Sequence, residues 1–314
     1  MKRNPSIELY RALLMLGICL LHGFSQGAFV YVWPARLLSV CLTAFVFISG
    51  WYGIRFSWKK AIGLVLIGWY CRYVGCVAYA LLAGMDLPSL NPFNALRATK
   101  VYWFLWAYIA LMLVAPVLNL AIEYAKAERK LLVFLPVFVL VFGWSYLCGM
   151  PTKGVLPNPG GAGGSAFLSF IGIYLAARLF KEFNLDAYVT KRVGIAVACV
   201  CCPAAMLGAG HHMNSVFALV LSAVMFVGMK NLGIPERYGK FLSLLSPSLF
   251  SVYLLHTHMF GFGFLERIDE VIIGGHAVLA CIVSAIMVFV IGLALDFPRR
   301  IVMEMSRKAM LFNV

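Results

Sequence analysis

Two basic side chains in the first apolar stretch have the types and the spacing to do chemistry inside a membrane. Arg11 and His22 are eleven residues apart in a segment that is otherwise almost entirely apolar. Eleven residues make about three helical turns, so a helix would place both side chains on nearly the same face, roughly 16 Å apart along its axis. Glu8 shares that face and could pair with Arg11. Because ionisable groups are costly in lipid, this face should point into a helix bundle or a water-filled cavity.

Histidine is the side chain best matched to proton transfer near neutral pH. His22 is therefore the leading catalytic candidate, and the alternative is a histidine that only hydrogen-bonds a neighbouring helix. Arg72 and His256 also lie in apolar stretches, where a polar side chain needs a partner or a cavity. For Arg72 the alternative is a structural ion pair, with Glu8 as a possible partner.

Other reaction and ligand classes lack their motifs. No two histidines have the i, i+4 spacing of a helical zinc motif, and the nine cysteines all fall in apolar runs without paired metal-ligand spacing. We therefore predict no metal site and no disulfide framework. A GxSxG elbow is absent as well, which disfavours a serine hydrolase. The remaining histidines are assigned to interfaces, helix ends or packing: His211, His212, His258 and His276.

The composition predicts an integral membrane protein. The 314 residues are 63% hydrophobic and 12% charged, with a mean hydropathy of +0.91, whereas soluble domains are about 45–50% apolar and about 25% charged. No polar segment approaches the roughly 50 residues of an independent soluble domain. The chain is expected to be one membrane domain over residues 1–314, with a retained first helix in place of a cleaved signal.

We expect an all-α bundle of about ten transmembrane helices, from windows of about 20 apolar residues. Of the 26 Lys and Arg residues, 19 fall in one alternating set of connections and 5 in the other. The positive-inside rule then places both termini in the cytoplasm. Topology alone would produce most of this bias, and an anionic, phosphate-bearing ligand could use the same charges, so the charge does not choose between the two interpretations. The predicted spans are 7–28, 34–54, 61–83, 101–122, 131–149, 166–180, 193–210, 214–230, 242–265 and 271–297.

These pieces, taken in order, resemble the membrane-bound acyltransferase-3 family. The first match is Arg11 and His22 with ten residues between them, and the second is Phe45-Val46-Phe47-Ile48-Ser49-Gly50, which ends the second span. Each motif is weak alone, but the ordered set covers essentially the whole chain. The later matches are Trp103-Phe104-Leu105 followed by Ala115-Pro116, and Tyr253-Leu254-Leu255-His256.

The resemblance implies an O-acyltransferase of the bacterial inner membrane. Such proteins transfer an acyl group, most often acetyl, from cytoplasmic acetyl-CoA or another acyl-CoA to a hydroxyl of an extracytoplasmic glycan or lipid-linked saccharide. The implied partners are thus the donor, the glycan and the lipid bilayer, with no nucleic acid, and a homo-oligomer is possible. His22 corresponds to the family's catalytic histidine, Arg11 to its paired arginine, and His256 to a histidine of less certain role.

One position departs from the family pattern. Many members carry two arginines three apart near the third helix, whereas here Trp69 stands where the first would precede Arg72. We expect the donor nucleotide to be held at the cytoplasmic mouth by basic residues, with the pantetheine arm running along the stripe from Arg11 to His22. Arg72, or His256 if protonated, could stabilise the oxyanion. The candidate nucleotide-binding residues are Arg55, Lys59 and Lys60.

His22 could act as a general base or as a nucleophile that carries the acyl group, and the sequence does not separate the two. Two other functions use the same intramembrane charges. A transporter or flippase of a glycan or small solute would move its substrate without acyl-CoA. A non-catalytic sensor built on the same fold would bind no acyl-CoA.

Overall fold

The computed structural model describes residues 4–25, 32–83, 92–99, 102–143, 166–209, 215–261 and 276–312. In these ranges the regular structure is helical, without a strand. Five of the described helices are long and apolar enough to cross a membrane, which confirms an all-α, multi-pass membrane protein. The count of ten spans, the cytoplasmic termini and the single domain stay predictions. The five spans are Pro5–Ser25, Val32–Tyr52, Trp58–Ala78, Trp103–Ala127 and Val278–Met305.

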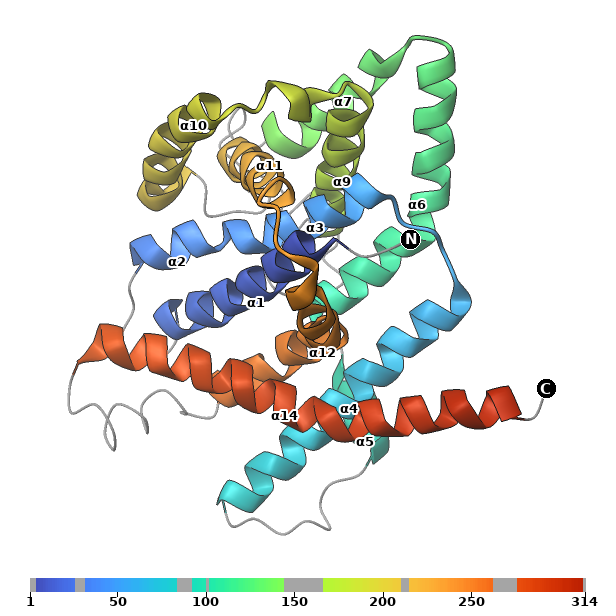
Figure 1. Ribbon diagram of the computed structural model, residues 1–314, viewed down its shortest axis with the longest axis vertical. Coiled ribbons are helices and arrows are strands. Elements are labelled where there is room, and N and C mark those ends of the chain that lie inside the picture. Colours follow the sequence, from blue (N-terminus) through green and yellow to red (C-terminus); the bar gives the residue numbers. More distant parts are fainter. Residues whose placement is uncertain are drawn as a thin grey trace. The chain divides into compact units, whose positions relative to one another are not determined.

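The chain forms two compact units. Unit 1 comprises Met1–Val30, Leu66–Thr99 and Ile234–Val314, and unit 2 comprises Tyr31–Val65 and Lys100–Gly233. In unit 1, three helices pack against one another in pairs, α1, α12 and α14 (Figure 1). Helix α4 begins in unit 2 and continues into unit 1. The helices of unit 1 are α1 (Pro5–Ser25), most of α4 (Trp58–Ala83), α5 (Pro92–Ala98), α12 (Glu236–Gly261) and α14 (Ala277–Phe312).

In unit 2, α3 packs against both α9 and α11, and α6 also packs against α9. The small residues at the end of α3 permit this, as the sequence predicted: a Cβ added at Gly50 would lie 2.7 Å from the Ala177 Cβ and 2.8 Å from the Tyr174 carbonyl oxygen. The longer helices of unit 2 are α2 (Val32–Leu38), α3 (Val40–Tyr52), α6 (Trp103–Ala127), α9 (Ala166–Glu182), α10 (Lys191–Ala204) and α11 (Val216–Lys230).

Two predicted spans are less regular than expected. The span at 131–149 consists, up to residue 143, of η3 (Leu131–Phe134), α7 (Leu135–Phe138) and the π-helical η4 (Val139–Gly143). The span at 193–210 is α10 followed by the π-helical η7 (Ala205–Ala209). A proline stands shortly before each π segment, Pro136 and Pro203. Proline has no N–H to donate to the carbonyl four residues earlier, so the helix changes its hydrogen-bond pattern there.

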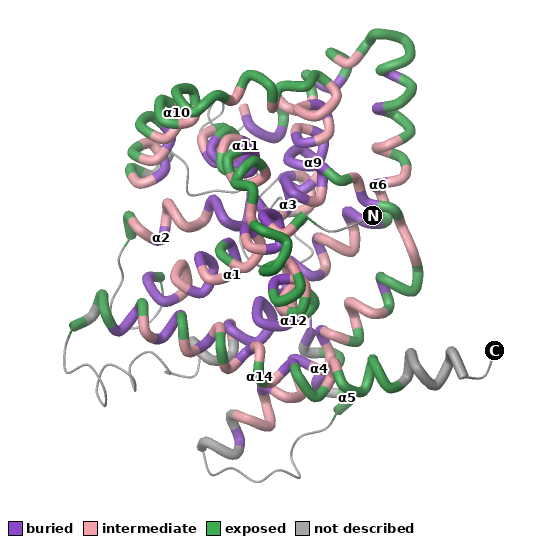
Figure 2. The backbone as a smooth tube through the Cα atoms, viewed as in Figure 1, coloured by how far each residue is buried: buried purple, intermediate pink, exposed green. Residues whose placement is uncertain are grey.

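Buried and exposed residues alternate along the long helices (Figure 2), and many of the exposed residues are large and apolar. On α14, Val278, Ile282, Ile286 and Val290 recur every four residues, and each is at least 39% exposed. Ser284, on the opposite side, is fully buried together with small and β-branched neighbours. An apolar outer stripe opposite a buried face of mostly small residues is the arrangement expected of a helix whose outer face meets lipid.

Candidate active site

Helix α1 carries the first two candidate residues. It runs unbroken from Pro5 to Ser25, so Arg11 and His22 do lie on one helix, as predicted. The Arg11 guanidinium donates to a Glu8 carboxylate oxygen at 3.2 Å. Glu8 is 4% exposed and Arg11 32%, so the acid is enclosed while the guanidinium reaches outward. This confirms the predicted pair, in which the Glu8 carboxylate binds the Arg11 guanidinium.

The structure brings His22 together with His256. The ring centroids of the two histidines are 4.6 Å apart, with the ring planes tilted by 53°. His22 comes from the last turn of α1 and His256 from α12, more than 200 residues later. His256 is fully buried, whereas His22 keeps some exposure. Two imidazoles in contact, one enclosed and one accessible, can orient each other and pass a proton between them.

The backbone of α12 fixes the protonation pattern of His256. Its Nδ1–H donates to the Tyr253 carbonyl one turn earlier. Because a carbonyl oxygen only accepts, Nδ1 must carry the proton, and in the neutral ring Nε2 is then the accepting nitrogen. The Tyr253 ring lies 5.2 Å from the His256 ring, measured between centroids. Tyr253 and His256 share one face of α12, as their spacing of three predicted.

Close helix packing encloses the two histidines. The Cys281 thiol of α14 donates to the Gly23 carbonyl at 3.1 Å, directly after His22. A Cβ added at Gly292 would lie 3.2 Å from a methyl of Val252, one turn before His256. Small residues thus let α14 approach both helices that carry the histidines, so the pair is positioned by backbone packing.

Arg72 lies on the part of α4 that belongs to unit 1. It is half-buried, and the residue before it, Cys71, donates its thiol to the Ser251 carbonyl of α12 at 3.9 Å. Tyr70 donates to the Leu295 carbonyl of α14 at 2.7 Å. Because Ser251 precedes His256 by five residues, the segment around Arg72 meets α12 more than one turn from the histidine pair. The role of Arg72 in stabilising an oxyanion stays a prediction.

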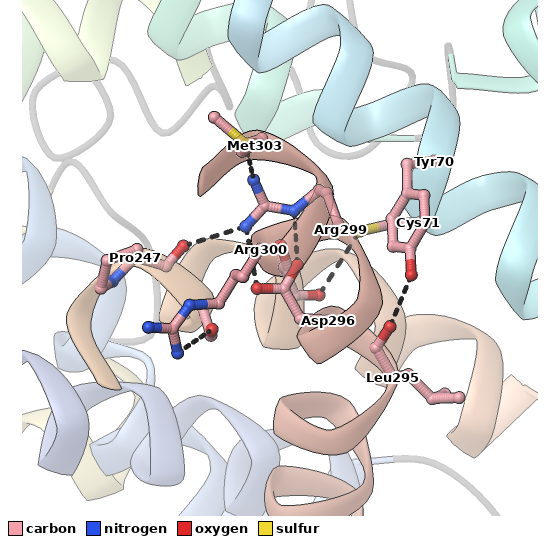
Figure 3. A network of polar contacts seen from close by, with 10 residues as sticks. Tyr70, Cys71, Pro247, Leu295, Asp296, Arg299, Arg300 and Met303 are labelled. Atoms are coloured by element: carbon pink, nitrogen blue, oxygen red, sulfur yellow. Dashed lines mark hydrogen bonds and ion pairs between the residues drawn. The ribbon is translucent and has the colours of Figure 1, made fainter. Parts of the chain in front are cut away.

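A buried ion pair on α14 escaped the sequence analysis (Figure 3). Arg299 donates to both carboxylate oxygens of Asp296, Nε at 2.6 Å and a terminal nitrogen at 2.8 Å. Asp296 is fully buried and the Arg299 side chain is 10% exposed. Arg299 also donates to the Pro247 carbonyl of α12 at 3.5 Å, and Arg300 to the Ser248 hydroxyl at 3.4 Å. The sequence feature that could have predicted this pair is the i, i+3 spacing of Asp296 and Arg299.

The three basic residues expected to bind the nucleotide lie in unit 2. Arg55, Lys59 and Lys60 are all exposed, Arg55 just after α3 and the two lysines in the first turn of α4. The backbone before them is fixed by a buried network: Tyr174 accepts from the Ile54 N–H at 3.0 Å and donates to Asn119 at 2.7 Å. Exposed cations on a fixed backbone suit an anionic ligand.

Several predicted features lie outside the described residues. The side chain of His258 is one of them, although its backbone belongs to α12. The described cysteines are free thiols, and within the described ranges no three His, Cys, Asp or Glu side chains form a group able to hold a metal. The other features outside the described part are the loop 150–165, most of the loop 84–100, Cys148, His211 and His212.

Comparison with known proteins gives one family. A family model described as an acyltransferase domain, of the acyltransferase-3 type, matches residues 4–299, which is nearly the whole chain. The matched region contains His22, Arg72 and His256. No curated protein and no solved structure gives a match.

Proposed function

The chain belongs to the acyltransferase-3 family, and we propose that it transfers an acyl group, most often acetyl, from cytoplasmic acyl-CoA to a hydroxyl of an extracytoplasmic glycan across the bacterial inner membrane. The family supplies the class of reaction. The observation that carries the proposal is the contact between His22 and His256, with ring centroids 4.6 Å apart. This contact supports a role for His22 in proton transfer, with the His256 imidazole beside it.

In the reaction we propose, neutral His22 removes the proton of the acceptor hydroxyl as its oxygen attacks the thioester carbonyl. The carbonyl oxygen becomes an oxyanion, which Arg72 stabilises. The carbon–sulfur bond then breaks, and the His22 imidazolium returns its proton to the leaving CoA thiolate. The products are an ester on the glycan and free CoA. In the covalent variant, a His22 nitrogen attacks the thioester carbonyl and expels the CoA thiolate, which takes the imidazole proton. The acceptor hydroxyl then displaces the acyl group from His22 and gives its proton back to the imidazole.

His256 acts in this scheme by orienting His22. Its Nδ1–H is committed to the Tyr253 carbonyl, so its Nε2 is the nitrogen that accepts a hydrogen bond. An N–H of the His22 ring that donates to this nitrogen leaves the other His22 nitrogen unprotonated for the acceptor hydroxyl. The scheme requires a neutral His256, whose side chain is fully buried.

Arg11 serves the donor in this proposal. Glu8 holds its guanidinium near one end of α1, about three turns from His22. That distance is too long for Arg11 to touch the reacting groups, and its partial exposure leaves donors for an incoming ligand. We assign Arg11 to binding the acyl donor and to orienting its arm along α1.

The proposal is tested with purified protein in detergent by measuring acyl-CoA binding and acceptor-dependent release of CoA thiol. General-base catalysis contributes about 10²–10⁴-fold, so His22→Ala should lower the turnover at least 100-fold. His276→Ala is the matched control, because His276 is exposed beside the first turn of α14. Full activity in a folded His22→Ala protein would refute the assignment. Substrate transport without any acyl-CoA binding would favour the transporter.

A further inference from the structure

The end of α3 in unit 2 is surrounded by cationic side chains from other helices. Lys181 of α9 donates to the Trp51 carbonyl at 3.2 Å, and its Nζ lies 5.6 Å from the centroid of the Trp51 ring. Lys230 of α11 places its Nζ 4.8 Å from the same centroid. Both ammonium groups therefore lie close to one buried indole, although they are far apart in the sequence.

A third cation, Arg178, lies against the turn that follows α3. One of its terminal nitrogens is 3.4 Å from the position that a Cβ would take at Gly53. Gly53 has a φ of 75°, which favours glycine, so the turn presents bare backbone to the guanidinium. The Arg178 side chain is only 14% exposed, its contact with Glu182 is long at 3.7 Å, and its buried Nε has no hydrogen-bond partner among the described residues.

The local charges do not balance. Glu182 is shared between Arg178 and Lys126, whose Nζ lies 2.5 Å from it, and Asp186 pairs with Lys230 at 2.6 Å. Four cations therefore meet two carboxylates, and the exposed Arg55 follows two residues after Gly53. We name Arg178, Lys181 and Lys230 the α3-end cluster.

Topology and helix capping explain only part of this arrangement. A helix C-terminus favours a cation, and Lys181 fills that role at the Trp51 carbonyl. The positive-inside bias is satisfied equally well by fully exposed lysines such as Lys191. Neither reason requires two further, partly enclosed cations beside the same turn. Glu182 and Asp186 compensate only part of the local positive charge, and a partly compensated, enclosed charge is costly.

We propose that the α3-end cluster binds the phosphate groups at the nucleotide end of the acyl donor, an inference that rests on the proposed acyl-CoA dependence. Phosphate oxygens suit this set: the guanidinium binds two of them in a fork, and the two ammonium groups supply point charges beside it. The proposal adds three residues of α9 and α11 to Arg55, Lys59 and Lys60, which the sequence had indicated.

The test is equilibrium binding of CoA and of adenosine 3′,5′-bisphosphate, which carries phosphates but no pantetheine arm, to purified full-length protein. We expect wild type to bind both, and Lys181→Ala, Lys230→Ala and Arg178→Lys each to weaken both at least tenfold. Arg178→Lys keeps the positive charge but removes the two-pronged guanidinium, so it tests whether binding needs the guanidinium geometry in addition to the charge. Lys191→Ala, a fully exposed lysine in the same unit, should stay within twofold of wild type. Elution volume and tryptophan fluorescence are used to check that each variant is folded. If Lys230→Ala is not folded, Lys230→Gln takes its place.

The outcomes separate this site from the proposed function. CoA binding that is unchanged in all three variants overturns the site and leaves the proposed function standing. Bisphosphate binding that depends on the cluster supports the site, and if acyl-CoA is then never consumed, the proposed function alone fails. Nanodiscs of phosphatidylcholine with and without phosphatidylglycerol distinguish a lipid headgroup. Displacement of the bisphosphate by phosphatidylglycerol would overturn the nucleotide assignment.

Discussion

The buried pair of Asp296 and Arg299 makes a quantitative prediction about stability. Asp296→Asn keeps the shape of the side chain but leaves the Arg299 charge, which is 10% exposed, without its carboxylate. Removing one partner of a buried, two-point ion pair costs about 3–5 kcal/mol, because the remaining charge stays enclosed. The asparagine oxygen still accepts one hydrogen bond, so we expect the lower end of that range.

The measurement is the midpoint of thermal unfolding in detergent, followed by tryptophan fluorescence. With about 2–4 °C per kcal/mol for chains of 150–250 residues, the expected loss is on the order of 10 °C. Glu128→Gln is the control within the same chain. Its pair with Lys130 has a distance of 3.5 Å and side chains that are 46% and 70% exposed, so the loss should be near zero.

A second variant tests the cause of the loss. In the double variant Asp296→Asn/Arg299→Met no buried charge remains, so the cost of an enclosed, unpaired charge is removed and only a buried amide is left without its partner. The double variant should therefore recover most of the midpoint that Asp296→Asn loses. The reasoning is refuted if Asp296→Asn behaves like Glu128→Gln, or if the second substitution adds to the loss.

Three further predictions concern packing, hydrogen bonding and catalysis. Gly50→Ala should destabilise the protein by about 1–3 kcal/mol, because its Cβ would meet the Ala177 Cβ at 2.7 Å; Gly228→Ala, with open space around it, should be neutral or stabilising in the same thermal assay. Tyr174→Phe removes the hydroxyl that accepts from the Ile54 N–H and should cost about 1–3 kcal/mol, and an unchanged midpoint would mean that the network adds nothing. His256→Gln should lower the turnover of acyl-CoA by roughly tenfold or more without unfolding the protein, and activity equal to wild type would remove His256 from the mechanism.

The sequence predicted what depends on one helix at a time. Arg11 and Glu8 pair because they are three residues apart on a continuous helix, and Gly50 permits close packing because it has no side chain. It could not predict that His22 meets His256, since periodicity gives the face of each helix but not which faces meet. The resemblance to a family pointed to both histidines, but it did not predict that they contact each other.

The missed features have physical reasons as well. Asp296 is at the end of the last predicted span, and Arg299 was counted among the cytoplasmic cations. The two residues were therefore assigned to different environments, and their buried pair was not predicted. The α3-end cluster is assembled from α9 and α11 around Trp51, and only the tertiary packing of these helices brings Lys181 and Lys230 to one ring.

The ion pair of Asp296 and Arg299 also gives a reference point for measuring distances along the helices of unit 1. The stretch from Val278 to Leu295 carries no charge, and its 18 residues span roughly 27 Å, close to the thickness of a bilayer's hydrocarbon core. Asp296 and Arg299 follow directly at the end of this stretch, and Arg299 also donates to the Pro247 carbonyl of α12. His256 lies nine residues beyond Pro247 on α12, about 13 Å along the helix axis. In the proposed reaction, donor and acceptor would therefore meet about 13 Å along α12 from the residues that end the uncharged stretch of α14.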